Sequence, residues 1–368
     1  MIGEVLDPKR AAITFEPTSE PVPVEERARL LADPGFGRVF TDHMAMIEYE
    51  DCRWRDARIT ARHPFTMDPA SPVLHYAQEI FEGMKAYRRP NGAAALFRPE
   101  ANARRFAKSA IRMAMPPLPE EMFLESVRAL VRADREWIPD TEEGSLYLRP
   151  FMIANGSFLG MRPSTQFIYA VIASSVASYF KTDSPSISLW VTREYVRAAP
   201  GGTGEAKCGG NYAGSLIAQA EAVREGCDQV VFLDAVERRW IEELGGMNIF
   251  FVFEDGSLQT PPLDGTILHG VTRDSLIRLA RDMGRSVREE DYSIEQWRED
   301  AESGRLTEAF ACGTAAVVTP IGRVKGRDGA FSIGGGAAGP VTLGLRSALV
   351  DIQRGAAPDP YGWIELVD

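Results

Sequence analysis

The stretch GGTGEAKCGGNYAGSLIAQAEAVREG, residues 201–226, places one lysine, Lys207, in a glycine-rich segment just before an amphipathic helical pattern. Backbone without side chains allows a small molecule to come close to the lysine amine. A single lysine in such a turn is more often an ordinary solvated residue, so the neighbouring sequence has to decide between the two interpretations. The glycines concerned are Gly201, Gly202, Gly204, Gly209 and Gly210.

Length, composition and charge restrict the class of protein. With 368 residues, two domains are expected, and 45% hydrophobic and 25% charged residues are typical of a soluble globular protein. The net charge of −11 makes nucleic acid and anionic membranes poor partners. The N-terminal sequence lacks the apolar core of a signal peptide, and the nearly apolar run 167–180 is too short to span a bilayer. We therefore expect a cytoplasmic protein.

Cysteine and histidine residues show neither metal-ligand spacing nor a CxxC pair, so we expect reduced thiols and no metal. The cysteines are Cys52, Cys208, Cys227 and Cys312, and the histidines are His43, His63, His75 and His269.

Strand and helix patterns alternate along the chain. The spacing of apolar residues predicts helices over 102–115, 120–137, 211–226 and 271–284, and a last helix near the C-terminus; Asn211 is expected to cap the third. Strands are expected over 145–156 and 187–192, with a hairpin that turns at Asp255 and Gly256. A shift to Ser, Thr, Asp and Pro marks a linker at 179–188. The expected domains are 1–178, with a surface arm over 1–45, and 189–368.

Three short motifs resemble known functional motifs, but their sequence context does not support those functions. The glycines of GGGAAG, 334–339, match a dinucleotide-binding fingerprint, but too little chain follows to complete that fold, so a turn is expected. Lys207 is followed by Cys208 rather than Ser or Thr, which excludes a P-loop. The pair Glu242 and Glu243 resembles a hydrolase dyad, but neighbours on a strand point to opposite faces, so at most one of them faces a site.

A Schiff-base lysine at position 207 implies pyridoxal phosphate, and this cofactor makes three demands of the protein. Its ring nitrogen needs an acid, for which Glu243 is the candidate, and its phenolic oxygen needs a donor, for which Tyr212 is the candidate. Its phosphate needs cations or exposed amides. Candidates for the phosphate are Arg105, the amides of Val271 and Thr272 at a predicted helix start, and Thr314.

Seven blocks of the sequence resemble those of the branched-chain amino acid aminotransferases, which are fold-type IV pyridoxal-phosphate enzymes. The blocks occur in the family's order over roughly residues 45 to 350. They are FEGMKAYR (81–88), LFRPEANARRF (96–106), SLYLRPF (145–151), EAKCGGNYAGSL (205–216), EELGGMNIFFV (242–252), GVTRDSL (270–276) and FACGTAAVVTP (310–320).

The resemblance implies a two-domain α/β fold, with a smaller N-terminal domain, a larger C-terminal pseudo-barrel domain and the active site between them. It assigns Lys207 as the catalytic residue that carries the cofactor, and it assigns the candidates for the ring and phosphate as the cofactor's other contacts. The residues that it places around the substrate are Phe81, Tyr147, Arg149, Ala315 and Ala316, with Tyr76 and Met161 contributed by the partner subunit of a homodimer.

The expected reaction moves the amino group between L-leucine, L-isoleucine or L-valine and 2-oxoglutarate, in branched-chain amino-acid biosynthesis, with amino acids and 2-oxo acids as the small-molecule partners. A D-amino-acid aminotransferase or an aminodeoxychorismate lyase would share the cofactor residues and remains an alternative. A pyridoxal-phosphate-binding protein without catalysis is a second alternative, against which the presence of Lys207, Tyr212 and Glu243 argues.

Overall fold

The computed structural model describes residues 13–177 and 186–367, which form two compact units. The first unit takes its described residues from Met1–Tyr179, Ala206–Gly209 and Ile352–Asp368. The second takes them from Phe180–Glu205 and Gly210–Asp351. Lys207 therefore packs with the first unit, although the helical segment that follows it belongs mainly to the second.

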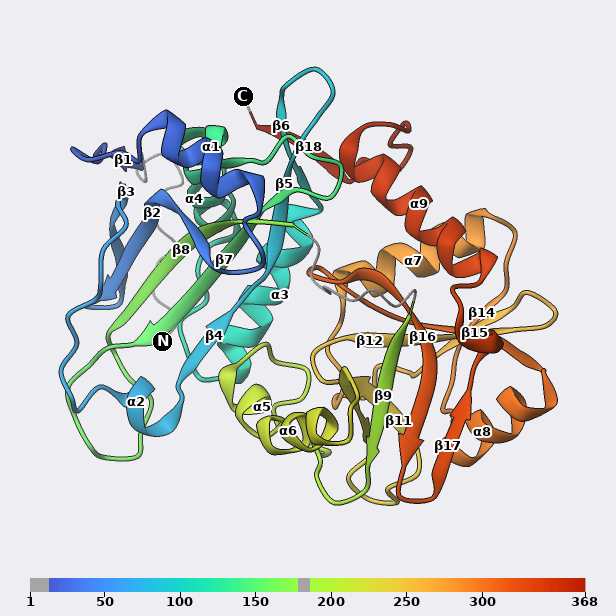
Figure 1. Ribbon diagram of the computed structural model, residues 1–368. Helices are drawn as coiled ribbons and strands as arrows, with labels where there is room; N and C mark the ends of the chain where they lie inside the picture. The colour runs from blue at the N-terminus through green and yellow to red at the C-terminus, as the bar shows by residue number, and fades with distance from the viewer. Residues whose placement is uncertain (1–12, 178–185, 368) are drawn as a thin grey trace. The chain divides into compact units, whose positions relative to one another are not determined.

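One sheet forms the framework of the first unit (Figure 1). Its neighbouring strands pair antiparallel, except that β1 runs parallel to β3. β4 pairs with β7 beside β5, so the chain between β4 and β5 is a short interruption along one edge of β7. In spatial order the strands are β1 (Thr14–Phe15), β3 (Arg53–Ala61), β2 (Val39–Glu50), β8 (Phe167–Val176), β7 (Ser145–Ala154), β5 (Met84–Arg88), β6 (Ala94–Phe97) and β18 (Ile364–Val367), with β4 (Glu79–Phe81) on β7.

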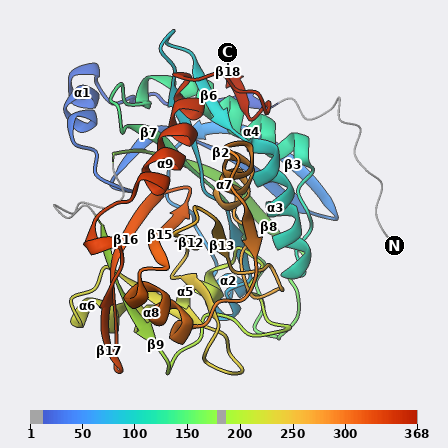
Figure 2. The ribbon, with the colours of Figure 1, turned by 90° about the vertical axis from the view of Figure 1, so that its right-hand side faces the viewer.

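Two amphipathic helices, α3 (Pro99–Arg112) and α4 (Glu120–Ala133), lie side by side against this sheet (Figure 2). Their apolar faces meet at Phe106 and Phe123, whose ring centroids are 5.3 Å apart, and both rings contact Tyr169 of β8. The Tyr169 hydroxyl is hydrogen-bonded to Ser126 Oγ at 2.9 Å, so its one polar atom has a partner in the core. The other helices of this unit are α1 (Val24–Ala32), α2 (Pro72–Tyr76) and the 3₁₀ turn η2 (Arg135–Trp137).

The second unit is built on a sheet of its own, in which parallel and antiparallel pairs are mixed. Phe251, Tyr292, Trp297 and Phe331 form an aromatic group in its core, with ring centroids between 4.5 and 5.6 Å apart in successive pairs. In spatial order the strands are β11 (Ile241–Leu244), β10 (Gln229–Leu233), β9 (Ile187–Thr192), β16 (Val317–Gly326), β15 (Leu306–Gly313), β12 (Asn248–Phe253), β13 (Leu258–Thr260) and β14 (Val287–Glu289), with β17 (Gly329–Ser332) on β16.

The helices of the second unit are α6 (Leu216–Arg224), α7 (Val271–Asp282), α8 (Ile294–Ser303) and the 3₁₀ turn η3 (Gly334–Gly336). Two further helices include residues of both units: α5 (Gly209–Ala213) and α9 (Pro340–Arg354). All three glycines of η3 have positive φ, so the predicted turn at GGGAAG is confirmed.

Most predicted elements are confirmed, including the α/β class, the strands β7 and β9, and the hairpin with Gly256 at φ 77°. The helix predicted over 211–226 is in fact two helices, α5 and α6. The predicted cap at Asn211 is wrong. Asn211 lies inside α5, where its side chain bonds to Thr203, donating to the carbonyl oxygen at 2.9 Å and accepting from the hydroxyl at 2.7 Å.

The predicted linker over 179–188 lies largely outside the described residues, as do residues 1–12 of the predicted arm. The domain boundaries drawn from the sequence therefore stay a prediction.

Candidate active site

An ion pair is buried in the first unit between Arg105 of α3 and Glu82 of the interruption between β4 and β5. Arg105 donates from Nε to Glu82 Oε1 and from Nη2 to Oε2, both at 2.7 Å. Asn102, one helical turn earlier, donates to Oε2 at 2.8 Å. Burial alone raises the pKa of Glu82, but Arg105, Lys207 and Asn102 outweigh it and hold the pKa below its usual value. Glu82 is therefore an ionised carboxylate in the interior.

The backbone of Lys207 is hydrogen-bonded to α3 and to Phe81, the residue before Glu82. Lys207 donates its backbone N–H to Ser109 Oγ of α3 at 3.0 Å, and its carbonyl oxygen accepts the Phe81 N–H at 3.0 Å. Its neighbours Ala206 and Cys208 are buried in the core of the first unit. Gly209 donates its N–H to the Glu79 carboxylate, and a Cβ at Gly209 would collide with that carboxylate. The backbone on both sides of Lys207 is thus fixed, which sets where its side chain begins.

Three predicted substrate residues form a connected group, and the lysine side chain contacts one of them, Phe81. Lys207 Nζ lies 4.9 Å from the centroid of the Phe81 ring, and the Arg149 guanidinium carbon is also 4.9 Å from it. Arg149 Nη2 donates to the Tyr147 hydroxyl at 3.1 Å. Gly83 makes room for that hydroxyl, because a Cβ at this position would overlap with it. The structure therefore brings an amine, a guanidinium, a phenol and an apolar ring together in the first unit.

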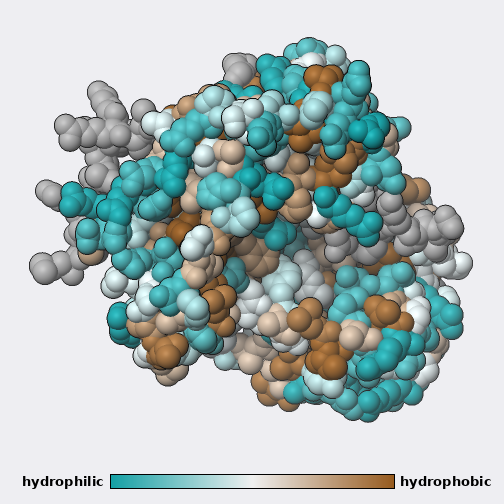
Figure 3. All heavy atoms as spheres, turned by 60° about the vertical axis from the view of Figure 1, so that its left-hand side comes forward, coloured by the Kyte–Doolittle hydropathy of each residue, from teal (hydrophilic) through white to brown (hydrophobic). Residues whose placement is uncertain are grey.

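The two residues predicted to act from a partner subunit are exposed. Tyr76 at the end of α2 is 40% exposed and donates its hydroxyl to the Leu159 carbonyl oxygen. Met161, two residues after Leu159, is 91% exposed. Leu159 itself is exposed, as is Leu74 of α2. We call Leu74, Tyr76, Leu159 and Met161 the α2 patch. Figure 3 shows exposed apolar groups of this kind among polar residues on the face that it draws.

In the second unit, Glu243 of β11 is buried among three hydrogen-bonding or charged groups. Its Oε1 accepts the backbone N–H of Leu268 at 2.7 Å and the Asn248 side-chain amide at 3.3 Å. Its Oε2 lies 3.2 Å from Nε of Arg197, which is itself buried. These donors suit a carboxylate that is charged inside the protein.

Asn248 connects Glu243 to the predicted phosphate residues. It donates to the Leu268 carbonyl oxygen at 3.2 Å, and Gly270 packs so closely on its side chain that a Cβ there would collide with it. Gly270 leads into α7, whose first residues are Val271 and Thr272, and no side chain caps this helix start. The first amides of a helix have no partner within it, which suits an anion.

The predicted Thr314, Ala315 and Ala316 form the tight turn between β15 and β16, where Gly313 pairs with Val317. Cys312, just before the turn, pairs with Asn248 across the β12–β15 ladder. This register places the turn at the same end of the sheet as Asn248. Burial raises the pKa of the Cys312 thiol, which keeps it neutral.

Tyr212 of α5 lies over the turn that follows Glu243. A Cβ at Gly246 would be 3.1 Å from a ring carbon and 3.3 Å from the hydroxyl of Tyr212, so the glycine allows this contact. The predicted residues of the second unit are thereby linked through Asn248 and the turn at Gly246.

Each unit thus brings together several of its own predicted residues, and Tyr76 and Met161 lie instead on the exposed α2 patch. Each unit also holds groups that the sequence did not indicate. In the first unit these are Glu82 and Ser109, and in the second Arg197 and Asn248. Their signal was faint: Glu82 lies inside the block FEGMKAYR, and Ser109 stands seven residues after Asn102 on one helix face. The strand pattern predicted that at most one of Glu242 and Glu243 faces a site. It did not predict that both side chains are buried.

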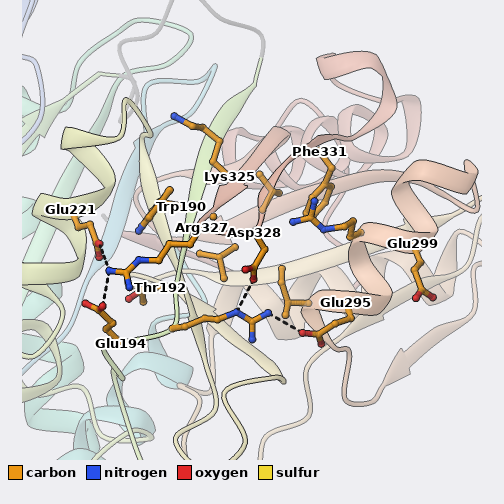
Figure 4. Close-up of a pocket in the computed structure, with 16 residues that line it drawn as sticks. Trp190, Thr192, Glu194, Glu221, Glu295, Glu299, Lys325, Arg327, Asp328 and Phe331 are labelled. Atoms are coloured by element: carbon orange, nitrogen blue, oxygen red, sulfur yellow. Dashed lines mark hydrogen bonds and ion pairs between the residues drawn. The ribbon is translucent and has the colours of Figure 1, made fainter.

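A cavity of about 320 Å³ lies elsewhere in the second unit and is lined by none of the predicted site residues (Figure 4). Two of its arginines pair with glutamates of its own wall: Arg327 lies 2.6 Å from Glu194, and Arg193 lies 2.9 Å from Glu295. Within residues 13–177 and 186–367, no cluster of His, Cys, Asp and Glu has the arrangement of a metal site. Over the same residues, no helix has the length and apolar character needed to cross a membrane.

Comparison with known proteins agrees with this arrangement. Residues 79–324 match the family of class IV amino-transferases. A probable branched-chain-amino-acid aminotransferase of Streptomyces coelicolor is 53% identical over 357 residues, which are 96% of this chain and 98% of the relative. The branched-chain-amino-acid aminotransferase of Mycobacterium tuberculosis H37Rv is 52% identical over 92% of this chain and 94% of its own.

Solved structures agree as well. The branched-chain amino acid aminotransferase from Escherichia coli matches with a TM-score of 0.72 at 29% identity, over 89% of this chain and 99% of that one. The enzyme from Thermobaculum terrenum, solved in its PLP-bound holo-form, matches with a TM-score of 0.71 at 26% identity, over 89% and 98%. Class IV amino-transferases use pyridoxal 5′-phosphate (PLP) as their cofactor. The chain belongs to this family of class IV amino-transferases and matches its branched-chain members over almost the whole of its length.

Proposed function

We propose that this protein transfers the amino group between a branched-chain L-amino acid, namely leucine, isoleucine or valine, and 2-oxoglutarate. The observation that carries the proposal is the position of Lys207 Nζ, 4.9 Å from Phe81, whose ring Arg149 also approaches. The identity of 53% to a probable enzyme of this kind supports the same reaction class.

The residues present fit pyridoxal phosphate in charge and in kind. The cofactor is an aldehyde on an aromatic ring with a phosphate arm, so it needs an amine, a fixed anion and an anion-binding group. Lys207 supplies the amine, and Glu243 is a buried carboxylate held by Leu268, Asn248 and Arg197. The start of α7 has no side-chain cap, Gly246 leaves room for the Tyr212 ring, and Gly270 leaves room for the Asn248 side chain.

When bound, the cofactor supplies an electron-withdrawing ring that stabilises negative charge at the substrate α-carbon. Glu243 keeps the ring nitrogen protonated, and Tyr212 donates its hydroxyl to the phenolic oxygen. Lys207 would anchor the cofactor through its amine, and the same amine, once released, would accept the proton from the substrate α-carbon as the general base. We assign the phosphate to Arg105, the amides of Val271 and Thr272, and the Thr314 hydroxyl.

The substrate residues suit two different side chains. The Phe81 ring offers apolar surface to a branched aliphatic chain, while the Arg149 guanidinium and the Tyr147 hydroxyl offer charge-assisted bonds to the second carboxylate of 2-oxoglutarate. We assign the α-carboxylate to the turn that contains Ala315 and Ala316.

We also propose that the enzyme is a homodimer in which the α2 patch of one subunit completes the substrate site of the other. The exposure of 91% at Met161 supports this, because a large apolar side chain gains by being covered.

The visible absorption spectrum of the purified protein tests the reaction. The bound cofactor should give a visible band that bleaches with L-leucine and returns with 2-oxoglutarate. A band that bleaches with D-leucine and not with L-leucine indicates the D-amino-acid enzyme. A band that neither amino acid changes indicates the lyase or a cofactor-binding protein without catalysis, and no band after addition of pyridoxal phosphate rejects the cofactor assignment altogether.

A further inference from the structure

Glu82 has no place in the proposed mechanism, yet it is the most completely enclosed charge of the first unit's site. Its exposed fraction is 0%, and four donors converge on its carboxylate. Besides Arg105 and Asn102, the backbone N–H of Gly83 donates to Oε2 at 3.1 Å. A carboxylate buried at such cost in desolvation has to be compensated by fixed partners.

The local fold explains how Glu82 reaches this position. β4 and β5 both pair with β7, and Glu82 and Gly83 form the interruption between them. The Glu82 N–H donates to the Pro150 carbonyl oxygen at 2.7 Å, which holds the interruption against β7. With its backbone fixed there, the side chain meets α3 rather than solvent.

One face of α3 carries all the side-chain partners. Asn102, Arg105 and Ser109 stand at positions i, i+3 and i+7, which lie on one side of a helix. The first two bond to Glu82, and the third accepts the backbone N–H of Lys207. Phe81, next to Glu82 in the chain, donates its own N–H to the Lys207 carbonyl oxygen, and its ring centroid lies 4.9 Å from Lys207 Nζ. The positive charge of Lys207 in turn helps to hold the pKa of Glu82 below its usual value.

We propose that Glu82 is a positioning residue, which fixes the orientation of the Arg105 guanidinium for the cofactor phosphate and stabilises positive charge on the Lys207 nitrogen. An arginine has five N–H donors, so a two-bond pair with a carboxylate sets the plane of the guanidinium without using all of them. The inference rests on the proposed function, because it assumes that Arg105 holds the phosphate and that Lys207 carries the cofactor.

Removing the charge of Glu82 should have two separable consequences. Glu82→Gln keeps the size and an acceptor oxygen but removes the charge, so Arg105 loses its charged partner and the affinity for pyridoxal phosphate falls. A charge-assisted hydrogen bond corresponds to roughly a 10- to 100-fold change in affinity. The loss of negative charge near Lys207 also lowers the pH at which the visible band of the loaded protein changes, since the protonated nitrogen is less stabilised.

Cofactor titration of the apo-protein and a pH titration of the loaded protein test both consequences, with thermal unfolding of the apo-protein recorded beside them. Glu308→Gln is the matched control. Glu308 is a buried carboxylate of the second unit that accepts hydrogen bonds from Val341 and Thr342, and it lies outside the predicted site residues. This control should lose stability and keep both the cofactor Kd and the pH midpoint.

If Glu82→Gln does not fold, Glu82→Asp replaces it: the charge remains, so the pH midpoint should stay near the wild-type value while the Kd rises. A wild-type Kd in either variant, or a shifted midpoint in Glu82→Asp, overturns the positioning role. An unshifted midpoint in Glu82→Gln overturns it as well. If wild-type protein binds no pyridoxal phosphate, the proposed function itself is rejected. If wild-type protein binds it normally and Glu82→Gln binds it equally well, only the positioning role is rejected.

Discussion

Phe81 and Lys207 contact each other twice: the Phe81 N–H donates to the Lys207 carbonyl oxygen at 3.0 Å, and the Lys207 Nζ lies 4.9 Å from the Phe81 ring centroid. The first contact fixes the backbone of the lysine, and the second places its amine against an apolar ring. A predicted catalytic residue and a predicted substrate residue are thereby joined within one compact unit, although 207 and 81 are far apart in sequence.

Lys207→Ala should abolish transamination, because the proposed anchor and general base are the same amine. The variant should still bind pyridoxal phosphate through its other contacts, with a spectrum like that of the aldehyde in solution. Turnover with L-leucine and 2-oxoglutarate measures the loss. Lys108→Ala, an exposed lysine on α3, is the control and should keep full activity. Wild-type turnover in Lys207→Ala contradicts the assignment.

Arg149→Leu should weaken 2-oxoglutarate far more than L-leucine, since only the first has a second carboxylate for the guanidinium. The loss of one charge-assisted pair corresponds to roughly 10- to 100-fold in kcat/KM for 2-oxoglutarate. Half-reactions with each substrate separate the two effects, and Arg149→Lys, which keeps the charge, should lose less. An equal loss for both substrates rejects this role of Arg149.

Arg197→Leu should destabilise the second unit strongly. Arg197 and Glu243 are both about 4% exposed in their side chains, and removing one member of a buried ion pair leaves the other charge without compensation. A loss of about 3 kcal/mol in the free energy of unfolding is expected from comparable buried pairs. Urea denaturation of the apo-protein measures it. The double variant Arg197→Leu with Glu243→Gln should recover part of the loss, and a further loss in the double variant speaks against the pair.

The sequence predicted the elements better than the assembly of the site. Helices and strands followed from apolar spacing, which is local, and the hairpin at Gly256 followed from its turn residues. The strand β18 at the C-terminus was not foreseen, because its pairing with β6 depends on residues more than 250 positions away. The split between α5 and α6 was missed because Gly214 and Ser215 interrupt a pattern that otherwise continues.

For the site, family motifs identified the residues that are assigned to the cofactor. They did not identify the residues whose hydrogen bonds or ion pairs fix those cofactor residues in position. Ser109 and Arg197 became visible only through their contacts, since a polar residue on an apolar helix face or in a loop has no distinctive signal of its own. Such positioning groups depend on tertiary neighbours, which local sequence does not specify.

The α2 patch should mediate dimer formation. Met161→Glu places a charge at a 91% exposed apolar position, which costs little in a monomer but is unfavourable when the surface is covered. The variant should sediment more as a monomer at equal protein concentration and lose activity with it. Val236→Glu, at a position that is 77% exposed in the second unit, is the control and should leave the mass unchanged. A wild-type dimer that Met161→Glu does not weaken means that another surface forms the interface.

The pH dependence of stability should reveal Glu242. Burial raises its pKa to about 7, with Thr266 and Arg197 opposing the shift, and its Oε2 has no hydrogen-bond partner in the described part of the chain. The folded state therefore binds a proton that the unfolded state releases near pH 4.5, the ordinary pKa of this group. Stability from this group is fully present below pH 4.5 and is lost as the pH rises through about 7.

Glu242→Gln isolates this contribution, because glutamine stays neutral at every pH. The difference in the free energy of unfolding between variant and wild type should grow in favour of the variant from pH 5 to pH 8. His43 also loses stabilisation as the pH rises, since its hydrogen bond to Asp134 raises its pKa, but this change is common to both proteins and cancels in the difference. A difference that does not vary with pH means that the carboxyl of Glu242 titrates alike in both states.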